Sequence, residues 1–170
     1  KQIMAHQRFL GKFIGANGVL PWMVQQFDLK YQPIHLLRHP GAVVASQMKL
    51  FANEWFVVRG VNLQRQLSAY YLEQYGNYLS TLKTQPERLI AYWCLHNVVA
   101  LEHHQKQWMT IYYEHLLLQP KEVFGQLFST WNIEQPKEIL ERLDVPSSVN
   151  LDLAAEKTVQ LSKWRKSFNE

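Results

Sequence analysis

The sequence has little cysteine, no long apolar run and no large excess of charge of either sign. With one cysteine, Cys94, the chain cannot form an internal disulfide, which fits a reducing compartment. No apolar run approaches the roughly 18 residues needed to span a membrane. The net charge of +4 suits an anionic ligand but is too small to indicate nucleic-acid binding. Repeats, low-complexity tracts and N-x-[ST] glycosylation sites are absent from the sequence.

The composition is that of one globular domain. Apolar residues make up 47% and aromatic residues 13% of the 170, which is enough for a core and unlike a disordered chain. We therefore treat residues 1–170 as a single domain. The chain opens at Lys1 in sequence that already has the pattern of folded protein, so we expect it to be the C-terminal portion of a longer parent.

The sequence is organised around residues 33–50, PIHLLRHPGAVVASQMKL. The apolar run 34–37 predicts a buried strand, and the residues after Pro40 have the apolar spacing of a helix. Arg38 stands at the carboxyl end of the strand, where α/β folds bind their ligands, and Ser46 lies two turns into the helix. This pattern predicts an anion site in an α/β fold. An exposed arginine before a helix start is the structural alternative.

The rest of the chain is predicted to be mostly helical. Residues 108–113, WMTIYY, are β-branched and aromatic and predict a second strand, which Glu114 closes. We expect Glu114 to be structural, accepting hydrogen bonds at the strand end or at a helix start. Tyrosines of the helix at 62–82 are expected to turn most of their rings to the core, with an aromatic cage as the alternative. Helices are predicted at 21–27, 62–82, 85–105, 120–130 and 135–143.

Histidines gather around the end of the helix at 85–105 without the spacing of a metal site. Two ligands on one helix face usually stand four residues apart, and no pair among these four histidines does. We therefore expect no metal, and a solvated helix end where histidine suits the helix dipole. The four are His96, His103, His104 and His115. The apolar stripe of the same helix is expected to comprise Leu89, Tyr92, Trp93, His96, Val99 and Ala100.

Several motifs, in this order, resemble those of sulfotransferases that use 3′-phosphoadenosine-5′-phosphosulfate (PAPS). The pattern R-H-P-x(5)-S, from Arg38 to Ser46, is similar to the 3′-phosphate motif of that family. Residues 93–97 are similar to a W-x(3)-N stretch of the bacterial and Golgi-type members, and residues 113–120 resemble the segment Y-E-D-L-x(3)-P. Residues 162–165, SKWR, resemble the terminal S-x-W-R segment.

The resemblance implies a P-loop-like parallel sheet flanked by helices and a transferase that moves a sulfuryl group from PAPS to a hydroxyl or amine. Arg38 and Ser46 would hold the nucleotide 3′-phosphate, and Lys163, Trp164 and Arg165 would close over the nucleotide. PAP would be the product, and no metal is needed. The acceptor would be a small molecule or a glycan, with no nucleic acid as partner. We expect a cytoplasmic location, or the Golgi lumen if the parent carries an anchor.

The sequence also departs from the family. It contains no loop of the kind that holds the 5′-phosphosulfate and no G-x(4)-G-K-[ST] motif. Ala42 stands where the family often has an acidic residue, and His115 replaces the aspartate of Y-E-D-L. The general base is unassigned, and His6 is a candidate because it is the one histidine upstream of His35. A P-loop kinase-like relative and a non-enzymatic helical binding module are the alternative interpretations.

Overall fold

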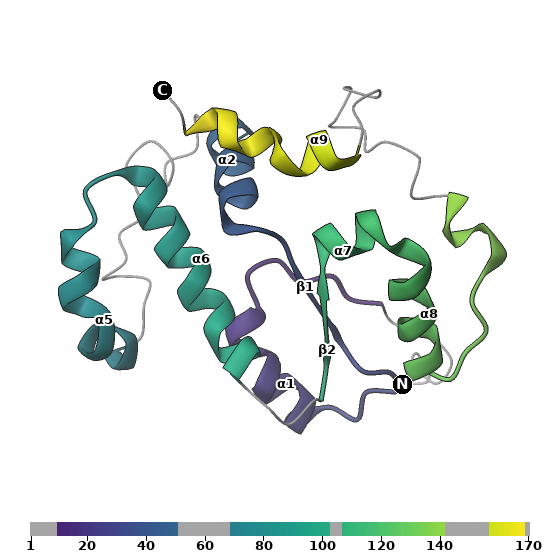
Figure 1. Cartoon of the computed structure of the whole chain (residues 1–170). Helices are drawn as coiled ribbons and strands as arrows, with labels where there is room; N and C mark the ends of the chain where they lie inside the picture. The colour runs from purple at the N-terminus through teal and green to yellow at the C-terminus, as the bar shows by residue number, and fades with distance from the viewer. Residues whose placement is uncertain (1–9, 51–68, 103–106, 142–156, 169–170) are drawn as a thin grey trace.

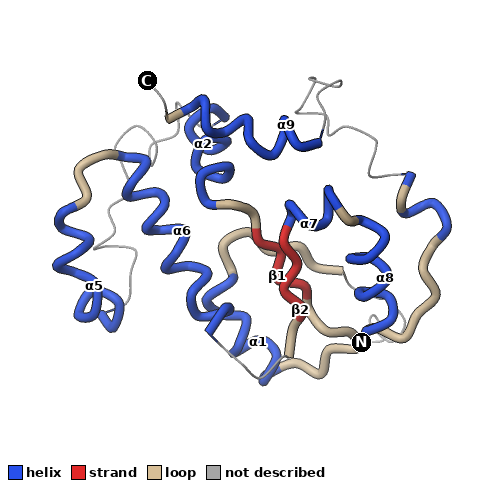
Figure 2. Tube along the Cα trace, in the orientation of Figure 1, coloured by secondary structure: helices blue, strands red, loops and turns tan. Residues whose placement is uncertain are grey.

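The computed structural model describes residues 10–50, 69–102, 107–141 and 157–168 (Figure 1). In this part of the chain, helices surround a small parallel sheet, which gives a helix-rich α/β class (Figure 2). The strands are β1 (Ile34–Leu37) and β2 (Met109–Tyr112). The α-helices are α1 (Leu20–Gln26), α2 (Pro40–Leu50), α5 (Ala69–Thr81), α6 (Gln85–Glu102), α7 (Tyr113–Leu118), α8 (Pro120–Thr130) and α9 (Lys157–Ser162). The 3-10 helices are η1 (Asn17–Val19), η2 (Lys137–Ile139) and η4 (Lys163–Ser167).

The two strands run parallel, because α2, α5 and α6 carry the chain back between them. The positions of both predicted strands are confirmed, the second one residue shorter at each end than the run at 108–113. The expectation that the strand at 34–37 is buried is wrong for one of its faces. Burial alternates along β1. His35 and Leu37 are buried, whereas Ile34 and Leu36 are 40% and 54% exposed. One face of β1 therefore packs into the protein, as a period of two residues requires.

Helix α6 packs against α2 in its first half and against η1 and α1 in its second half. Near the second contact, the indole N–H of Trp108 donates a hydrogen bond to the carbonyl of Ala100 over 3.2 Å. None of the described helices, including the 18-residue α6, is long and apolar enough to cross a membrane. The two buried clusters are Val44 with Leu82 and Leu89, and Leu20 with Ala100 and Trp108.

Local capping explains where two of the helices begin and end. Thr84 and Glu87 form a capping box before α6: the Glu87 carboxylate accepts the Thr84 N–H at 2.8 Å, and the Thr84 hydroxyl accepts the Glu87 N–H at 3.4 Å. The hydrogen bonds that the Glu87 carboxylate accepts from Thr84 and Lys83 lower the pKa of Glu87. Helix α8 ends at Thr130, and the chain turns away at Asn132, whose φ of 51° is left-handed, while the Ile133 N–H returns to the carbonyl of Phe128.

Two predictions of secondary structure are wrong. Residues Tyr113–Leu118 form α7, where the sequence predicts a strand end and a connection. The chain turns directly from β2 into α7, and Gln119 alone separates α7 from α8. The helix predicted at 135–143 is 3-10 structure in its described part, with one turn over Lys137–Ile139. It cannot begin before Lys137, because Pro136 has extended backbone angles of −61° and 134°.

Burial on α5 and α6 also differs from the prediction. Helix α6 buries Leu95 and Asn97 together with Leu89 and Ala100, whereas the remaining residues of the predicted stripe are half-buried. Asn97 is buried because it faces His35 of β1. Helix α5 has no buried residue, and its Tyr70 and Tyr78 are 64% and 65% exposed. The tyrosines do not enter the core because α5 lies at the edge of the described structure, against α6 (Figure 1).

Candidate anion-binding site

Arg38 follows β1 directly and lies at the carboxyl edge of the sheet. Because Leu37 pairs with Tyr112 in the parallel register, the next residues of the two segments, Arg38 and Tyr113, come side by side. The guanidinium carbon of Arg38 lies over the Tyr113 ring, 4.9 Å from its centre, in a cation–π contact. The contact fixes a half-buried arginine whose planar N–H groups match the oxygens of a phosphate.

The turn from β1 into α2 has its backbone amides occupied by two side chains. The His39 N–H donates to Oε1 of Glu114 at 2.9 Å, and the Gly41 N–H donates to Nδ1 of His39 at 3.1 Å. Since Nδ1 accepts, the proton of the neutral His39 ring is on Nε2. The carboxylate of Glu114 also suits the positive end of α2. Glu114 thus accepts a hydrogen bond at a helix start, as the sequence predicts.

The C-terminal segment packs on this turn through Trp164. The indole ring stacks on the ring of His39, with centres 4.3 Å apart and planes 23° apart. It also lies against the backbone of Gly41, where a Cβ atom would be 2.5 Å from Cζ3 of Trp164. Only glycine permits that approach. Helix α9 and η4 therefore cross the carboxyl ends of the strands, from α7 to α2 (Figure 1).

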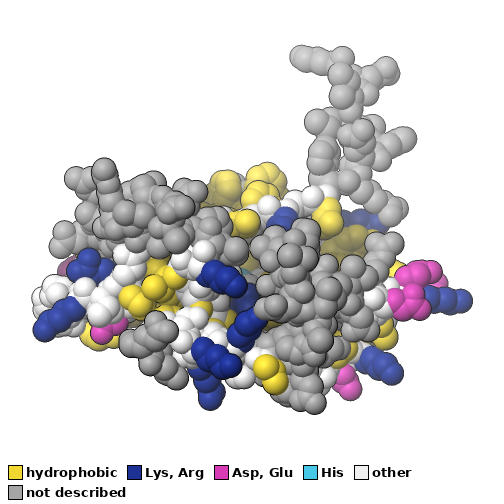
Figure 3. Space-filling model, turned by 90° about the horizontal axis from the view of Figure 1, so that it is seen from above, with side chains coloured by type: hydrophobic (Ala, Val, Ile, Leu, Met, Phe, Trp, Pro, Cys, Tyr) yellow, Lys and Arg dark blue, Asp and Glu magenta, His cyan; other side chains and the backbone are white. Residues whose placement is uncertain are grey.

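Basic side chains gather above this edge of the sheet. Lys163, Arg165 and Lys166 are exposed on η4, and the guanidinium carbon of Arg165 lies 5.7 Å from the centre of the Trp164 ring. Seen from above, Lys and Arg side chains lie near the middle of the face as well as at its sides, whereas Asp and Glu lie mainly towards the sides (Figure 3). The structure therefore brings Arg38, Trp164 and Arg165 to one edge of the sheet.

The other predicted site residues do not all join this cluster. Ser46 is half-buried in the second turn of α2. It lies about 9 Å along the helix axis from Pro40, at 1.5 Å of rise per residue. Lys163 is the first residue of η4 and stands next to Trp164. His6 lies outside the described residues.

A second polar cluster, which is not among the predicted sites, joins β1, α6 and η1 in the interior. Oδ1 of Asn97 is 3.0 Å from Nε2 of His35 and accepts an N–H from the Asn17 side chain at 2.7 Å, while Nδ2 of Asn97 donates to the carbonyl of Trp93 at 2.7 Å. Nε2 of His35 is therefore the protonated nitrogen, and Nδ1 is buried with no hydrogen-bond partner. Burial lowers the pKa of His35, opposed by the hydrogen bond to Asn97.

Part of this buried cluster could be predicted from the sequence. His35 alternates with the apolar neighbours of a predicted strand, which puts it on the same face as Leu37. Asn97 stands out only as part of the W-x(3)-N stretch. Asn17 lies in a glycine-containing segment with no periodicity, so nothing in the sequence marks it.

The described residues contain no group of three or more His, Cys, Asp or Glu side chains that could hold a metal ion. The donors near Arg38 are instead guanidinium and ammonium groups, which suit an anion. A scan against protein-family models finds no match, and searches of curated proteins and of solved structures find no similar protein.

Proposed function

We propose that this chain binds the 3′-phosphate of PAPS or PAP at the carboxyl edge of its sheet, as part of a PAPS-dependent sulfotransferase. One observation carries the proposal. The Arg38 turn and the segment containing Trp164 and Arg165, more than 120 residues apart in the sequence, meet at the end of β1. These are two of the segments that resemble the nucleotide-binding motifs of the family.

The chemistry of the edge supports binding of an anion by side chains. The first amides of α2 already donate to Glu114 and to His39, so a phosphate would depend on the guanidinium groups and not on a bare helix end. Arg38 offers a fixed, half-buried guanidinium, and Arg165 offers an exposed one. A hydroxyl such as that of Ser46 would add a neutral donor.

The proposed fold is a P-loop-like parallel sheet, of which β1 and β2 would be two strands. The proposed reaction is in-line transfer of the sulfuryl group to a hydroxyl or amine, driven by positioning and charge stabilisation as in phosphoryl transfer. Residues of this chain are assigned to the 3′-phosphate and to closure over the nucleotide. No residue is assigned to the 5′-phosphosulfate, for which the sequence contains no matching loop.

The test is calorimetric titration of the chain with PAP, with adenosine 5′-monophosphate as a control that lacks only the 3′-phosphate, and with ATP. We expect binding of PAP and a much weaker response to the other two. Arg38→Ala should weaken PAP binding by about 1.5–3 kcal/mol, the value of hydrogen bonds to a charged group. The matched control is Lys121→Ala, which removes one exposed positive charge on α8.

Three results would overturn the proposal. Unchanged PAP affinity in Arg38→Ala would remove the assigned site. Binding of ATP without PAP would favour a kinase-like nucleotide protein. No heat with any of the three nucleotides, for a chain that unfolds cooperatively, would favour a binding module without nucleotide chemistry.

A further inference from the structure

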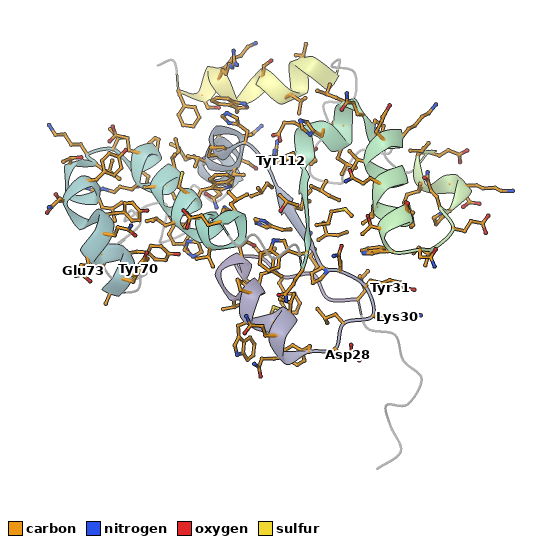
Figure 4. The ribbon with its side chains drawn as sticks, turned by 60° about the horizontal axis from the view of Figure 1, so that its bottom comes forward. Asp28, Lys30, Tyr31, Tyr70, Glu73 and Tyr112 are labelled. Carbon is orange, nitrogen blue, oxygen red and sulfur yellow. The ribbon has the colours of Figure 1, made fainter. Side chains whose placement is uncertain are left out.

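A cavity of about 290 Å³ lies between α5 and the last turns of α6. It is at the opposite end of α6 from the contact with α2, and so away from the Arg38 edge. Its volume is just below the range of small-molecule pockets, which span roughly 300–1,000 Å³. Figure 4 shows Tyr70 and Glu73 at the start of α5, beside this region. The described lining residues are Tyr70, Tyr71, Gln74 and Tyr75 from α5, and Val98, Val99 and Glu102 from α6.

Three tyrosine rings wall the cavity from the α5 side. Tyr70 and Tyr71 meet edge to face, with centres 5.4 Å apart and planes 69° apart. Tyr71 and Tyr75 are nearly parallel, with centres 6.4 Å apart. The faces of aromatic rings carry negative charge density, so tyrosine rings that line a cavity favour a cation there. The valines opposite provide an apolar surface for carbon groups.

The described lining of the cavity carries charge of one sign. Among the described residues that line it, Glu102 is the one that carries a charge. Burial, and then the negative charge of Glu102, raise the pKa of the Tyr71 hydroxyl above its usual value of 10.0. The field of Glu102 therefore reaches the tyrosine wall, and a positive ligand would be favoured where a negative one is opposed.

We propose that this cavity binds a small organic ammonium ion, with the tyrosine rings around the cationic head and Glu102 as the counter-charge. A rounded head with methyl groups, such as trimethylammonium, suits these surroundings better than a metal ion or an ammonium group that needs several hydrogen bonds. The proposal is independent of the sulfotransferase assignment, because the cavity and the Arg38 edge use different residues and prefer ligands of opposite charge.

The experiment is an NMR titration of the full chain with choline, observed through ¹³C-labelled tyrosine rings and the trimethyl proton line. We expect saturable shifts confined to a few of the tyrosines, and an upfield shift of the trimethyl protons from the ring currents. The neutral isostere 3,3-dimethyl-1-butanol has the same shape without the charge and should shift the tyrosines little. Equal binding of both compounds would overturn the proposal.

Two substitutions localise the site. Glu102→Gln should weaken choline binding by about three- to fivefold, the size expected for one partly solvated charge pair. It acts at an exposed residue, so the fold should persist. The matched control is Glu73→Gln, an exposed carboxylate on α5 outside the lining. Equal effects of the two would overturn the assignment to this cavity. Sedimentation of the chain with phosphatidylcholine vesicles would reassign the cavity from a free cation to a lipid headgroup.

Discussion

Two histidines four residues apart on one segment, His35 and His39, have opposite surroundings. His35 points into the protein from β1 and is 3% exposed, with Nε2 bound to Asn97 and Nδ1 without a partner. His39 is exposed at the start of α2, where Nδ1 accepts the N–H of Gly41 and the ring face stacks on Trp164. Each ring contacts a second segment of the chain, but only the ring of His35 is buried away from water.

We therefore expect the contacts of His35 to determine the stability of the fold, and those of His39 to position the C-terminal segment. The buried histidine and Asn97 join the chain near Asn17 to β1 and α6, and a polar group left unpaired there cannot turn to water. The exposed histidine joins α2 to the C-terminal segment, and water can replace each of its contacts. Breaking the first connection should therefore affect the whole fold, and breaking the second should mainly release the segment that carries Arg165.

The largest effect is expected from Asn97→Ala. This substitution removes the acceptor of His35 and Asn17 and the donor to Trp93 at once. We expect a loss of about 3 kcal/mol in the free energy of unfolding, since buried donors left unpaired each cost on the order of 1–3 kcal/mol. Urea unfolding measures it. Asn77→Ala on the exposed side of α5 is the matched control. A loss no larger than the control's would show that the buried cluster contributes little.

A smaller effect is expected from Trp164→Ala. The ring is half-buried against His39 and Gly41, so the loss should be about 2 kcal/mol, below the roughly 3–5 kcal/mol of a core tryptophan. The His39 ring protons should shift in the NMR spectrum when the stacked indole is removed. Trp22→Ala, at a tryptophan that is 55% exposed, is the control. Unchanged His39 signals would mean that the two rings do not stack in solution.

The order of helices and strands could largely be predicted, because particular residue types mark where the elements begin. Pro40, Pro86 and Pro120 all lie in the first turn of their helices, and short runs of β-branched and aromatic residues mark both strands. Helix α7 could not be predicted, because it continues from β2 without a capping side chain or a break. The exposure of α5 could not be predicted either, since helical spacing does not say how many neighbours a helix has.

The candidate site likewise has one part that the sequence predicts and another that it does not. Arg38 at the end of β1 follows from local sequence, because a strand, a proline turn and a helix fix its place. Its pairing with Tyr113 depends on the parallel register, and the fit of Trp164 on Gly41 depends on where the C-terminal segment folds. Both are contacts between residues far apart in the chain. Sequence spacing alone can suggest such contacts only through resemblance to a known family.

The smallest and most specific effect is the pH dependence of stability that comes from His35. Burial lowers the pKa of His35 below its ordinary value of 6.5, so below that pH the unfolded chain takes up a proton that the folded chain resists. The contribution of His35 is therefore complete above pH 6.5 and is lost as the pH falls towards its lowered pKa. The slope from this group is at most about 1.4 kcal/mol per pH unit.

Urea unfolding of His35→Gln between pH 8 and pH 5 should show a shallower fall in the free energy of unfolding than the wild-type chain, because that proton is no longer bound. His39→Gln makes the same change at an exposed ring and is the control. Parallel curves for the wild-type chain and His35→Gln would mean that His35 is not held neutral by the fold.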